Sequence, residues 1–341
     1  MEGKINISEI AKDLGVSIST VSRAINGKKG VSDKQREKIL AYVRKTGYRA
    51  NPLLLKEGYS PAIKIVAIIL GDIRNPFYAD LVFNIQKILN EQGYMVIIFN
   101  SEYDVDREIS QLSTINNNNF AGLILVTASV SRIKDKIDSM NMPTVLVNRI
   151  VPGYEGVSVL TDNFQAGYLA AMHLIELNHK KIGFIKGHCV SSASSQRYSG
   201  YRQAMNNYSL PVDDRFVYDG SLKVESGEQA AEEFLKLDKE QRPTAMIAVN
   251  DLTAIGFMNV CRRHNILFPQ DVSLVGFDDI WCSSAEGINL TTVSQHVEEM
   301  SQRAANMLLE RMSGKEKDAE RIIITPSLIL RGTTGSPRRT E

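Results

Sequence analysis

Two different hydrophobic periodicities divide the chain near residue 62. Up to residue 49, apolar positions recur with helical spacing: in the stretch 7–14 they fall at i, i+3, i+4 and i+7, on one face of a helix. From residue 63 onwards, short β-branched runs alternate with amphipathic helical stretches. The pattern therefore predicts a small all-α unit in front of a larger α/β body.

The stretch 16–27, VSISTVSRAING, predicts a second short helix packed against the first. Gly15 tolerates the positive φ of a tight turn, Ser17 is a capping residue, and Val21 provides an apolar contact between the two helices. The outer side of this helix carries small hydroxyl groups, one isoleucine and one arginine, a surface suited to phosphates and base edges: Ile18, Ser19, Thr20, Ser22 and Arg23.

A third helix is predicted to begin at Ser32, which forms a capping box with Gln35. Its apolar residues, among them Ile39 and Val43, are expected to face the first two helices. Three helices around one small core would make a headpiece.

The body contains about eight predicted strands before its C-terminal segment, at residues 63–70, 94–99, 122–126, 144–147, 181–185, 216–219, 245–249 and 272–276. Helical stretches such as 78–92, 165–177 and 251–263 separate them. The strands are nearly continuous apolar runs, which is typical of parallel sheets covered on both faces. Eight strands favour two consecutive sheets over one.

Most conspicuous polar side chains of the body follow the carboxyl ends of these strands. Ligands of doubly wound sheets bind at that edge, so the pattern predicts a cleft between two lobes for a small polar ligand. The candidate ligand-binding residues are Asp72, Phe77, Asn148, Arg149, Asp162, Arg197, Asn250, Asp278 and Trp281.

The charge distribution adds a second expectation. The net charge is only +1, but residues 1–60 hold twelve Lys and Arg against six Asp and Glu, whereas the remainder holds 28 against 33. Positive charge is thus concentrated on the helical unit, as a polyanionic partner requires.

The chain has three cysteines, which are widely spaced and lack the spacing of metal ligands. We therefore expect reduced thiols, no metal and no cofactor. No apolar run reaches the length of a membrane span and no signal core is present, which predicts a cytoplasmic protein with no membrane partner.

The headpiece residues resemble the signature of the LacI family of bacterial transcriptional repressors. The resemblance runs in order through Ile10, Ala11, Gly15, Val16, Ser17, Thr20, Val21, Ser22, Arg23, Asn26, Val31, Ser32, Arg36 and Tyr48. It continues in the body through Asn75-Pro76-Phe77, Arg197 with Gly200, Asn250-Asp251 and the stretch 276–279.

The resemblance implies an α/β fold with two periplasmic-binding-protein-like lobes of parallel sheet (type I), preceded by a helix-turn-helix headpiece. The implied domains are a headpiece at 1–49, a hinge at 50–61, a ligand-binding domain at 62–331 and a disordered tail at 332–341. The N-lobe would comprise about 62–161 and 292–324, and the C-lobe about 162–291 and 325–331. The chain would cross between them near Asp162, Thr291 and Thr325.

In the LacI family the hinge becomes helical on DNA and presses a leucine between base pairs. This sequence departs from that pattern, because Ala50 replaces a usual proline and Glu57 stands where the wedge leucine is expected. A carboxylate is repelled by DNA, so either Leu54 or Leu55 wedges in a shifted register, or the DNA is bent less. The leucines could equally pack against the body or a second copy.

Family roles can be carried to matching positions of the cleft. Arg197 resembles the arginine that grips ligand hydroxyls or a carboxylate, and Asp278 the acid that accepts from hydroxyls. Phe77 and Trp281 would either stack on the ligand or pack in the core. Asp162 would contact the ligand or serve the lobe crossing, and Asn148 stands where relatives frequently carry aspartate.

The leading hypothesis is a repressor of a carbohydrate utilisation operon that binds a pseudo-palindromic DNA operator as a homodimer and responds to a small effector, a sugar or sugar derivative. Ile18, Ser19 and Arg23 would meet base edges. The phosphate candidates are Ser17, Thr20 and Asn26, and Ser22, Ser32, Leu54 and Leu55 complete the DNA-binding set.

The alternatives are a cytoplasmic enzyme or a solute receptor with an incidental helical domain. No Gly-rich phosphate loop follows the first strand and no catalytic arrangement is supported, which disfavours an enzyme. A solute receptor would need an export signal.

Overall fold

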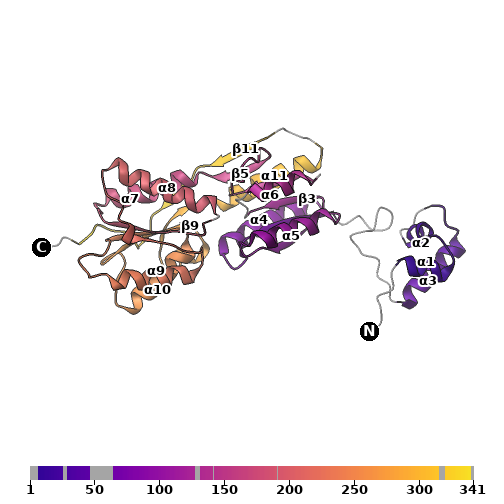
Figure 1. The fold of residues 1–341 in the computed structure, drawn as a ribbon, viewed down its shortest axis with the longest axis horizontal. Coiled ribbons are helices and arrows are strands. Elements are labelled where there is room, and N and C mark those ends of the chain that lie inside the picture. Colours follow the sequence, from indigo (N-terminus) through magenta and orange to yellow (C-terminus); the bar gives the residue numbers. More distant parts are fainter. Residues whose placement is uncertain are drawn as a thin grey trace.

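A computed structural model of the chain contains a three-helix unit and a two-lobed α/β body (Figure 1). This arrangement confirms the predicted fold class. The structure describes residues 7–25, 29–46, 64–126, 131–140, 142–189, 191–314 and 319–338.

The three-helix unit consists of α1 (Ile7–Leu14), α2 (Ile18–Ile25) and α3 (Asp33–Thr46). Its small core buries residues from all three helices: Ile10, Ala11, Val21, Ala24 and Ile39. The Ser17 hydroxyl accepts a hydrogen bond from the backbone N–H of Thr20 at 3.1 Å, which confirms the predicted cap of α2. The outer face of α2 is left in solvent, with Ile18 exposed.

The N-lobe holds a six-stranded parallel sheet in the order β11-β5-β4-β3-β1-β2. Its strands are β1 (Lys64–Leu70), β2 (Tyr94–Asn100), β3 (Gly122–Leu125), β4 (Thr144–Val147), β5 (Ser158–Thr161) and β11 (Arg321–Ile324). One face is covered by α4 (Pro76–Glu91) and α11 (Val297–Met312), and the other by α5 (Val105–Asn116) and α6 (Ser131–Asp138).

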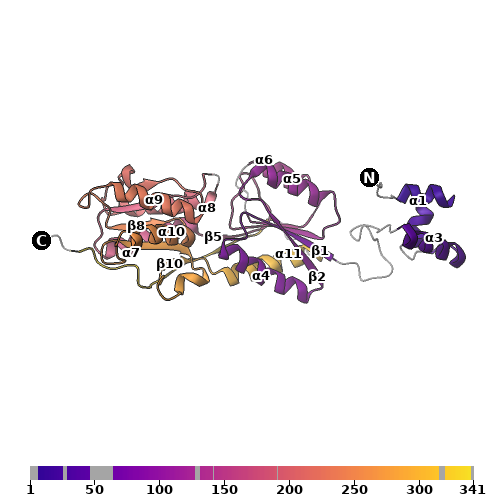
Figure 2. The same cartoon turned by 90° about the horizontal axis from the view of Figure 1, so that it is seen from below.

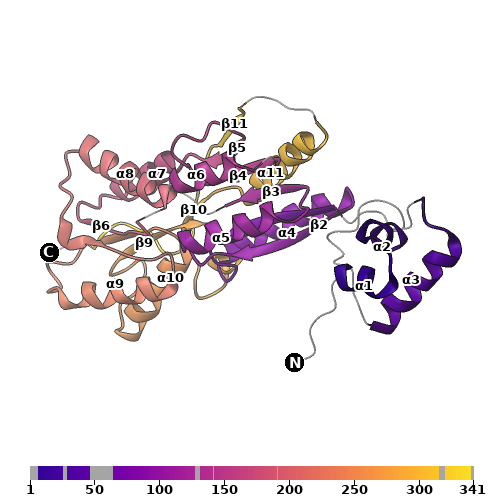
Figure 3. The same ribbon diagram turned by 45° about the vertical axis from the view of Figure 1, so that its right-hand side comes forward.

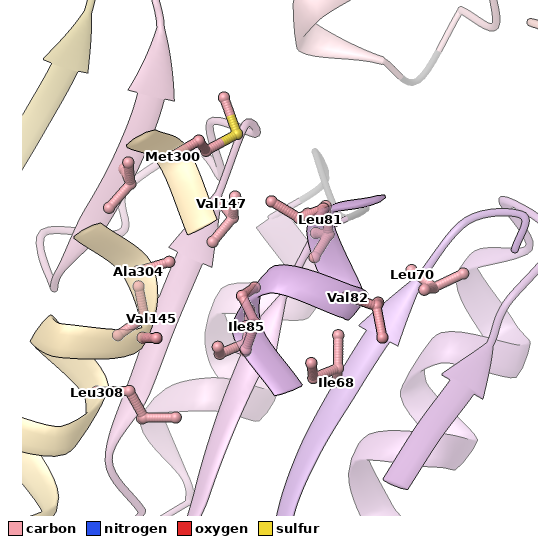
Figure 4. Close-up of a cluster of buried hydrophobic side chains, with 14 of the residues drawn as sticks. Ile68, Leu70, Leu81, Val82, Ile85, Val145, Val147, Met300, Ala304 and Leu308 are labelled. Atoms are coloured by element: carbon pink, nitrogen blue, oxygen red, sulfur yellow. The ribbon is translucent and has the colours of Figure 1, made fainter. Parts of the chain in front are cut away.

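The side chains of strand β1 are buried by helices on both faces of this sheet. Val66, Ile68 and Leu70 belong to the core cluster that includes α4 and α11, and Figure 4 shows Ile68 near Val82 and Ile85 of α4. Ala67 and Ile69 pack against the opposite helices. A strand buried on both faces reads as one apolar run, which is why the sequence predicted it.

The C-lobe holds a second sheet in the order β12-β10-β9-β8-β6-β7, parallel except for β12. Its strands are β6 (Ile182–Ile185), β7 (Val217–Tyr218), β8 (Ala245–Ala248), β9 (Ser273–Asp278), β10 (Thr291–Ser294) and β12 (Ser327–Ile329). Helices α9 (Val224–Lys236) and α10 (Asp251–Arg263) cover one face, and α7 (Asn163–Glu176) and α8 (Ser192–Asn207) the other. Two short 3-10 helices are η2 (Asp214–Phe216) and η3 (Trp281–Ser284).

The chain passes between the lobes after β5, after β10, and between β11 and β12 (Figures 1 and 2). The second crossing corrects the expectation that placed it near Thr291 and assigned residues 292–294 to the N-lobe. These residues belong to β10, which pairs with β9 from Thr291 to Ser294, so the chain leaves the C-lobe only at Gln295. The β-branched run Thr-Thr-Val extends the C-lobe sheet instead of linking the lobes.

The prediction of a disordered tail from residue 332 is wrong for residues 332–338. The Thr333 hydroxyl donates to the carbonyl of Leu274 at 2.7 Å, and the Leu274 N–H donates to the carbonyl of Thr333 at 2.8 Å. Arg338 forms an ion pair with Asp271 at 3.1 Å. The small polar residues of this segment are ordered because their hydroxyl and backbone groups bond to the beginning of β9. The C-terminal end of the ribbon lies at the C-lobe (Figure 3).

Candidate functional site

A small cavity lies where the carboxyl edges of the two sheets meet. The N-lobe contributes Asn75, Phe77, Tyr78, Asn148 and Arg149 to its lining. The C-lobe contributes Ser191, Ala193, Ser194, Arg197, Leu222, Val249, Asn250 and Asp278, and the second crossing contributes Gln295.

Strand ends and helix caps explain how these side chains converge. Asn148 and Arg149 follow β4 directly, and Asp278 is the last residue of β9. Asn250 caps α10 by accepting from the N–H of Thr253 at 2.9 Å, and Asn75 caps α4 by accepting from the N–H of Phe77 at 3.1 Å. The carboxyl ends of the parallel strands, together with the first residues of the helices that follow them, therefore lie at one cleft.

Arg197 is held by three acceptors inside the C-lobe. Its Nε donates to Asn163 Oδ1 at 2.8 Å, and its Nη1 donates to the carbonyl of Val249 at 2.7 Å and to Asp278 Oδ1 at 3.4 Å. The guanidinium also lies over the ring of Phe277, 4.8 Å from its centroid. These contacts fix the orientation of the guanidinium at the cavity.

A chain of amides connects the two lobes behind Arg197. Asn148 Nδ2 donates to Gln295 Oε1 at 2.7 Å, and Gln295 Nε2 donates to Asp278 Oδ1. Asn163 Nδ2 donates to Asn148 Oδ1 at 3.2 Å. The end of β4 in the N-lobe is therefore hydrogen-bonded to the charged pair of the C-lobe through the crossing segments.

Burial dominates the electrostatics of the cavity. It lowers the pKa of Arg197, which the charge of Asp278 partly offsets, and it raises the pKa of Asp278 despite the nearby guanidinium. The charge of Arg149 further lowers the pKa of Arg197, so the two guanidinium groups repel each other across the cleft.

The outer face of α2 forms a second candidate site. Ser17, Ile18, Ser19 and Arg23 are exposed, and Thr20 and Ser22 are half-buried. The Ser17 hydroxyl lies 2.8 Å from that of Ser19 and 2.7 Å from that of Thr20, which gathers three hydroxyls at the start of the helix. Ser32 accepts from the N–H of Gln35 at 3.4 Å at the start of α3. The other predicted DNA contacts, Asn26, Leu54 and Leu55, lie outside the described residues.

Both units match family models in sequence. Residues 6–51 match bacterial regulatory proteins of the lacI family, and residues 63–332 match the periplasmic binding proteins and sugar binding domain of the LacI family. The chain belongs to the LacI family. This LacI-family protein is a helix-turn-helix transcriptional regulator and not an enzyme. The relatives that it matches along its whole length are transcriptional regulators too.

Three relatives illustrate the match. The HTH-type transcriptional regulator DegA of Bacillus subtilis is 31% identical, with 99% of this chain and 100% of DegA covered. A complex of the regulator CelR with cellobiose superposes with a TM-score of 0.72 at 26% identity, covering 97% of this chain and all of that one. A LacI family regulator of Enterococcus faecium with bound ribose gives 0.70 at 26% identity, covering 80% and 99%.

Three predicted cleft residues of the LacI-family regulator do not line the cavity. Asp72 pairs with Arg74 at 2.6 Å and lines a neighbouring hollow. Asp162 caps α7 by accepting from the N–H of Gln165 at 2.9 Å. Trp281 is 70% exposed on η3, because the adjacent Ile280 supplies the buried apolar anchor of this loop. The expectation that Trp281 stacks on the ligand or packs in the core is therefore corrected.

Sequence reasoning missed two members of the amide network, Asn163 and Gln295. Gln295 is the first residue after β10, a strand that was not predicted, so its place at the carboxyl edge was not recognised. Asn163 follows the capping residue of α7, and nothing in the sequence distinguishes it from an ordinary first-turn residue.

The described helices include none that is long and apolar enough to cross a membrane. The same part of the chain contains no group of His, Cys, Asp and Glu side chains that could hold a metal ion.

Proposed function

We propose that this regulator is a ligand-responsive repressor that binds a pseudo-palindromic operator as a homodimer, in the cytoplasm where the chromosome lies, and controls genes of carbohydrate use. The observation that carries the proposal is the presence in one chain of an exposed polar helix α2 and a polar cleft between two lobes. The structures of CelR and of the Enterococcus regulator contain cellobiose and ribose, which supports a sugar or sugar derivative as effector.

The exposed side chains of α2 define the proposed DNA contacts. Ile18 and Ser19 meet base edges in the major groove, Ile18 against a thymine methyl, and Arg23 donates to a guanine. The proposed phosphate contacts are made by Ser17, Thr20, Ser22, Asn26 and Ser32. Leu54 or Leu55 inserts into the minor groove. One short recognition helix reads few base pairs, so two headpieces on two half-sites are needed.

Exposed apolar residues on the N-lobe support the homodimer. Phe83 lies on α4, and Ile98 lies on the same face of β2, the edge strand next to this helix, while Met95 lies on the opposite face of that strand. Large apolar side chains gathered at a sheet edge and its adjoining helix are typical of a surface that pairs with a second copy. A two-fold pairing would place two headpieces side by side for two half-sites.

Contacts across the cleft suggest how ligand binding is transmitted. The Ile150 N–H of the N-lobe donates to the Ser192 hydroxyl of the C-lobe at 3.1 Å, and the rings of Tyr103 and His188 stack with centroids 6.3 Å apart. A ligand that changes these contacts would reorient the N-lobes of the dimer and the hinges attached to them. Couplings of this kind amount to about 1–3 kcal/mol.

The test is operator binding by the full chain, measured by fluorescence anisotropy on duplex DNA from the region upstream of its own gene. Arg23→Ala should weaken binding by about 1–3 kcal/mol. Arg202→Ala, which removes the same charge from the exposed surface of α8 in the C-lobe, should leave the affinity unchanged. Failure to bind any duplex at low salt, or equal losses in both variants, would refute the proposal.

A further inference from the structure

The charges that line the cavity do not balance. Arg149 and Arg197 are 5% and 4% exposed, and Asp278, the one carboxylate among the described lining residues, is 7% exposed. Asp278 is already engaged by Arg197 and by Gln295. The described lining therefore buries one positive charge more than it neutralises.

Arg149 forms no ion pair with any residue that the structure describes, although its charge lowers the pKa of Asp278. Its Nη1 donates to the carbonyl of Asn148 at 2.6 Å and its Nη2 donates to the Tyr78 hydroxyl at 2.9 Å, both neutral acceptors. Its Nε is buried and has no partner within the described part of the chain. Residues 127–130, which the structure does not describe and which follow β3 in sequence, include no acidic residue.

Such an arrangement is costly unless a ligand completes it. A buried cation without an anion loses its hydration and gains no compensating attraction. Arg149 follows β4 of the N-lobe and Arg197 lies on α8 of the C-lobe, so approach of the lobes brings two like charges together. An anion held at Arg149 would remove both penalties.

We propose that the effector is a sugar acid, a polyhydroxylated molecule with one carboxylate that binds Arg149. The free Nε–H of Arg149 donates to the carboxylate, and Arg197, Asp278 and Asn250 bond the hydroxyls. A single uncompensated charge matches a carboxylate better than a phosphate dianion. This inference rests on the proposed function, because it specifies the ligand of the same cleft.

Isothermal titration of the full chain with matched sugars tests the assignment. The probes are D-galacturonate, D-glucuronate and D-gluconate, the neutral sugars D-galactose and D-glucose, and D-glucose 6-phosphate. At least one acid should bind about 30-fold or more tightly than its neutral parent, the discrimination expected of a buried hydrogen-bonded charge pair. Equal or tighter binding of the neutral sugars, binding of the phosphate alone, or no binding by any acid would overturn it.

Variants locate the effect at Arg149. Arg149→Gln should reduce the affinity for the acid by about 30-fold or more and abolish the preference over the neutral parent. Its melting temperature without sugar should stay equal or rise, because the variant no longer buries an uncompensated charge. Arg303→Gln removes the same charge from the exposed surface of α11 and should preserve the preference. A fall in melting temperature with unchanged discrimination would show that Arg149 is only structural.

The result can be separated from the proposed function. Operator binding by the wild-type chain tests the repressor proposal without any sugar. If the operator is bound and the acids are not, only the sugar-acid inference fails. If the acids are bound and no operator is, the proposed function fails and the ligand assignment stands.

Discussion

Asp251 shows how one buried residue supports the cleft from behind. Its carboxylate is fully buried and accepts from the Thr292 hydroxyl at 2.6 Å, the Ser283 hydroxyl at 2.7 Å and the Ile280 N–H at 3.0 Å. These bonds fix the loop that follows Asp278 to the beginning of α10. Burial raises the pKa of Asp251 to about 7, and the nearby charge of Asp278 adds to the shift.

This shift predicts a pH-dependent stability that Asp251→Asn should remove. A carboxyl whose folded pKa lies above its unfolded value of 3.8 stabilises the fold fully below pH 4, and this contribution is lost as the pH rises through 7. A shift of this size corresponds to about 4 kcal/mol. The melting temperature of Asp251→Asn should therefore increase relative to wild type between pH 5 and pH 8.

The asparagine keeps an acceptor for Ile280 and Ser283 and an amide for Thr292, so the comparison isolates the charge. Groups with lowered pKa values, such as Asp72 beside Arg74, are present in both proteins and cancel. A difference in melting temperature that does not change with pH would show that Asp251 titrates normally.

At the residue scale, sequence reasoning found the cavity lining where it follows a recognised strand. Arg149, Asn250 and Asp278 come directly after, or at the end of, long apolar runs, and all three line the cavity. Gln295 was missed because its strand is short, and Trp281 was misplaced because the sequence does not show which of two adjacent apolar residues points inward. That choice is made by tertiary packing.

At the scale of elements, close helix pairs position Arg197. Helices α7 and α8 approach through Gly167 and Gly200: a Cβ at Gly167 would lie 1.9 Å from the carbonyl oxygen of Arg197, and one at Gly200 would lie 2.0 Å from that of Phe164. Only glycine permits this approach. Helices α9 and α10 use the same device, since a Cβ at Gly256 would lie 2.0 Å from the carbonyl of Val224.

Gly167→Ala should therefore lower both stability and ligand affinity. The added methyl group pushes α8 away from α7 at Arg197, with a typical overpacking cost of about 1–3 kcal/mol that exceeds the gain in helix propensity. Gly256→Ala introduces the same clash in the other helix pair and should cost similar stability with a smaller loss of ligand affinity. Calorimetric unfolding and ligand titration of both variants measure the two effects. If Gly167→Ala left the ligand affinity unchanged, the contact between α7 and α8 would not be needed to position Arg197 for ligand binding.

The elements differ in how far the sequence revealed them. Strand β1 was predicted within one residue because it is buried on both faces, whereas β5, β10 and β11 are four-residue strands without such a run. Residues 332–338 were interpreted as disordered because their Gly, Thr and Ser composition is typical of loops, yet their order comes from distant partners such as Leu274 and Asp271. The amino-acid composition of a segment does not predict contacts with residues that are distant in the sequence.

At the scale of the whole molecule, a helix-turn-helix unit is joined to a body whose cleft is the proposed effector site. Positive charge is concentrated in residues 1–60, so binding to an operator should weaken steeply with salt as counterions are released. The proposed ligand site uses different residues, those at the carboxyl edges of the two sheets. Regulation requires that ligand binding in the cleft changes the free energy of operator binding.

The most direct test of this central claim is the operator affinity of the full chain at fixed salt, measured by fluorescence anisotropy as the sugar acid that binds most tightly in the calorimetric panel is titrated. The account predicts a saturable change of about 5-fold to 150-fold. Its midpoint should lie in the concentration range over which the cleft fills by calorimetry. An operator affinity that stays constant while the cleft is saturated would contradict the account.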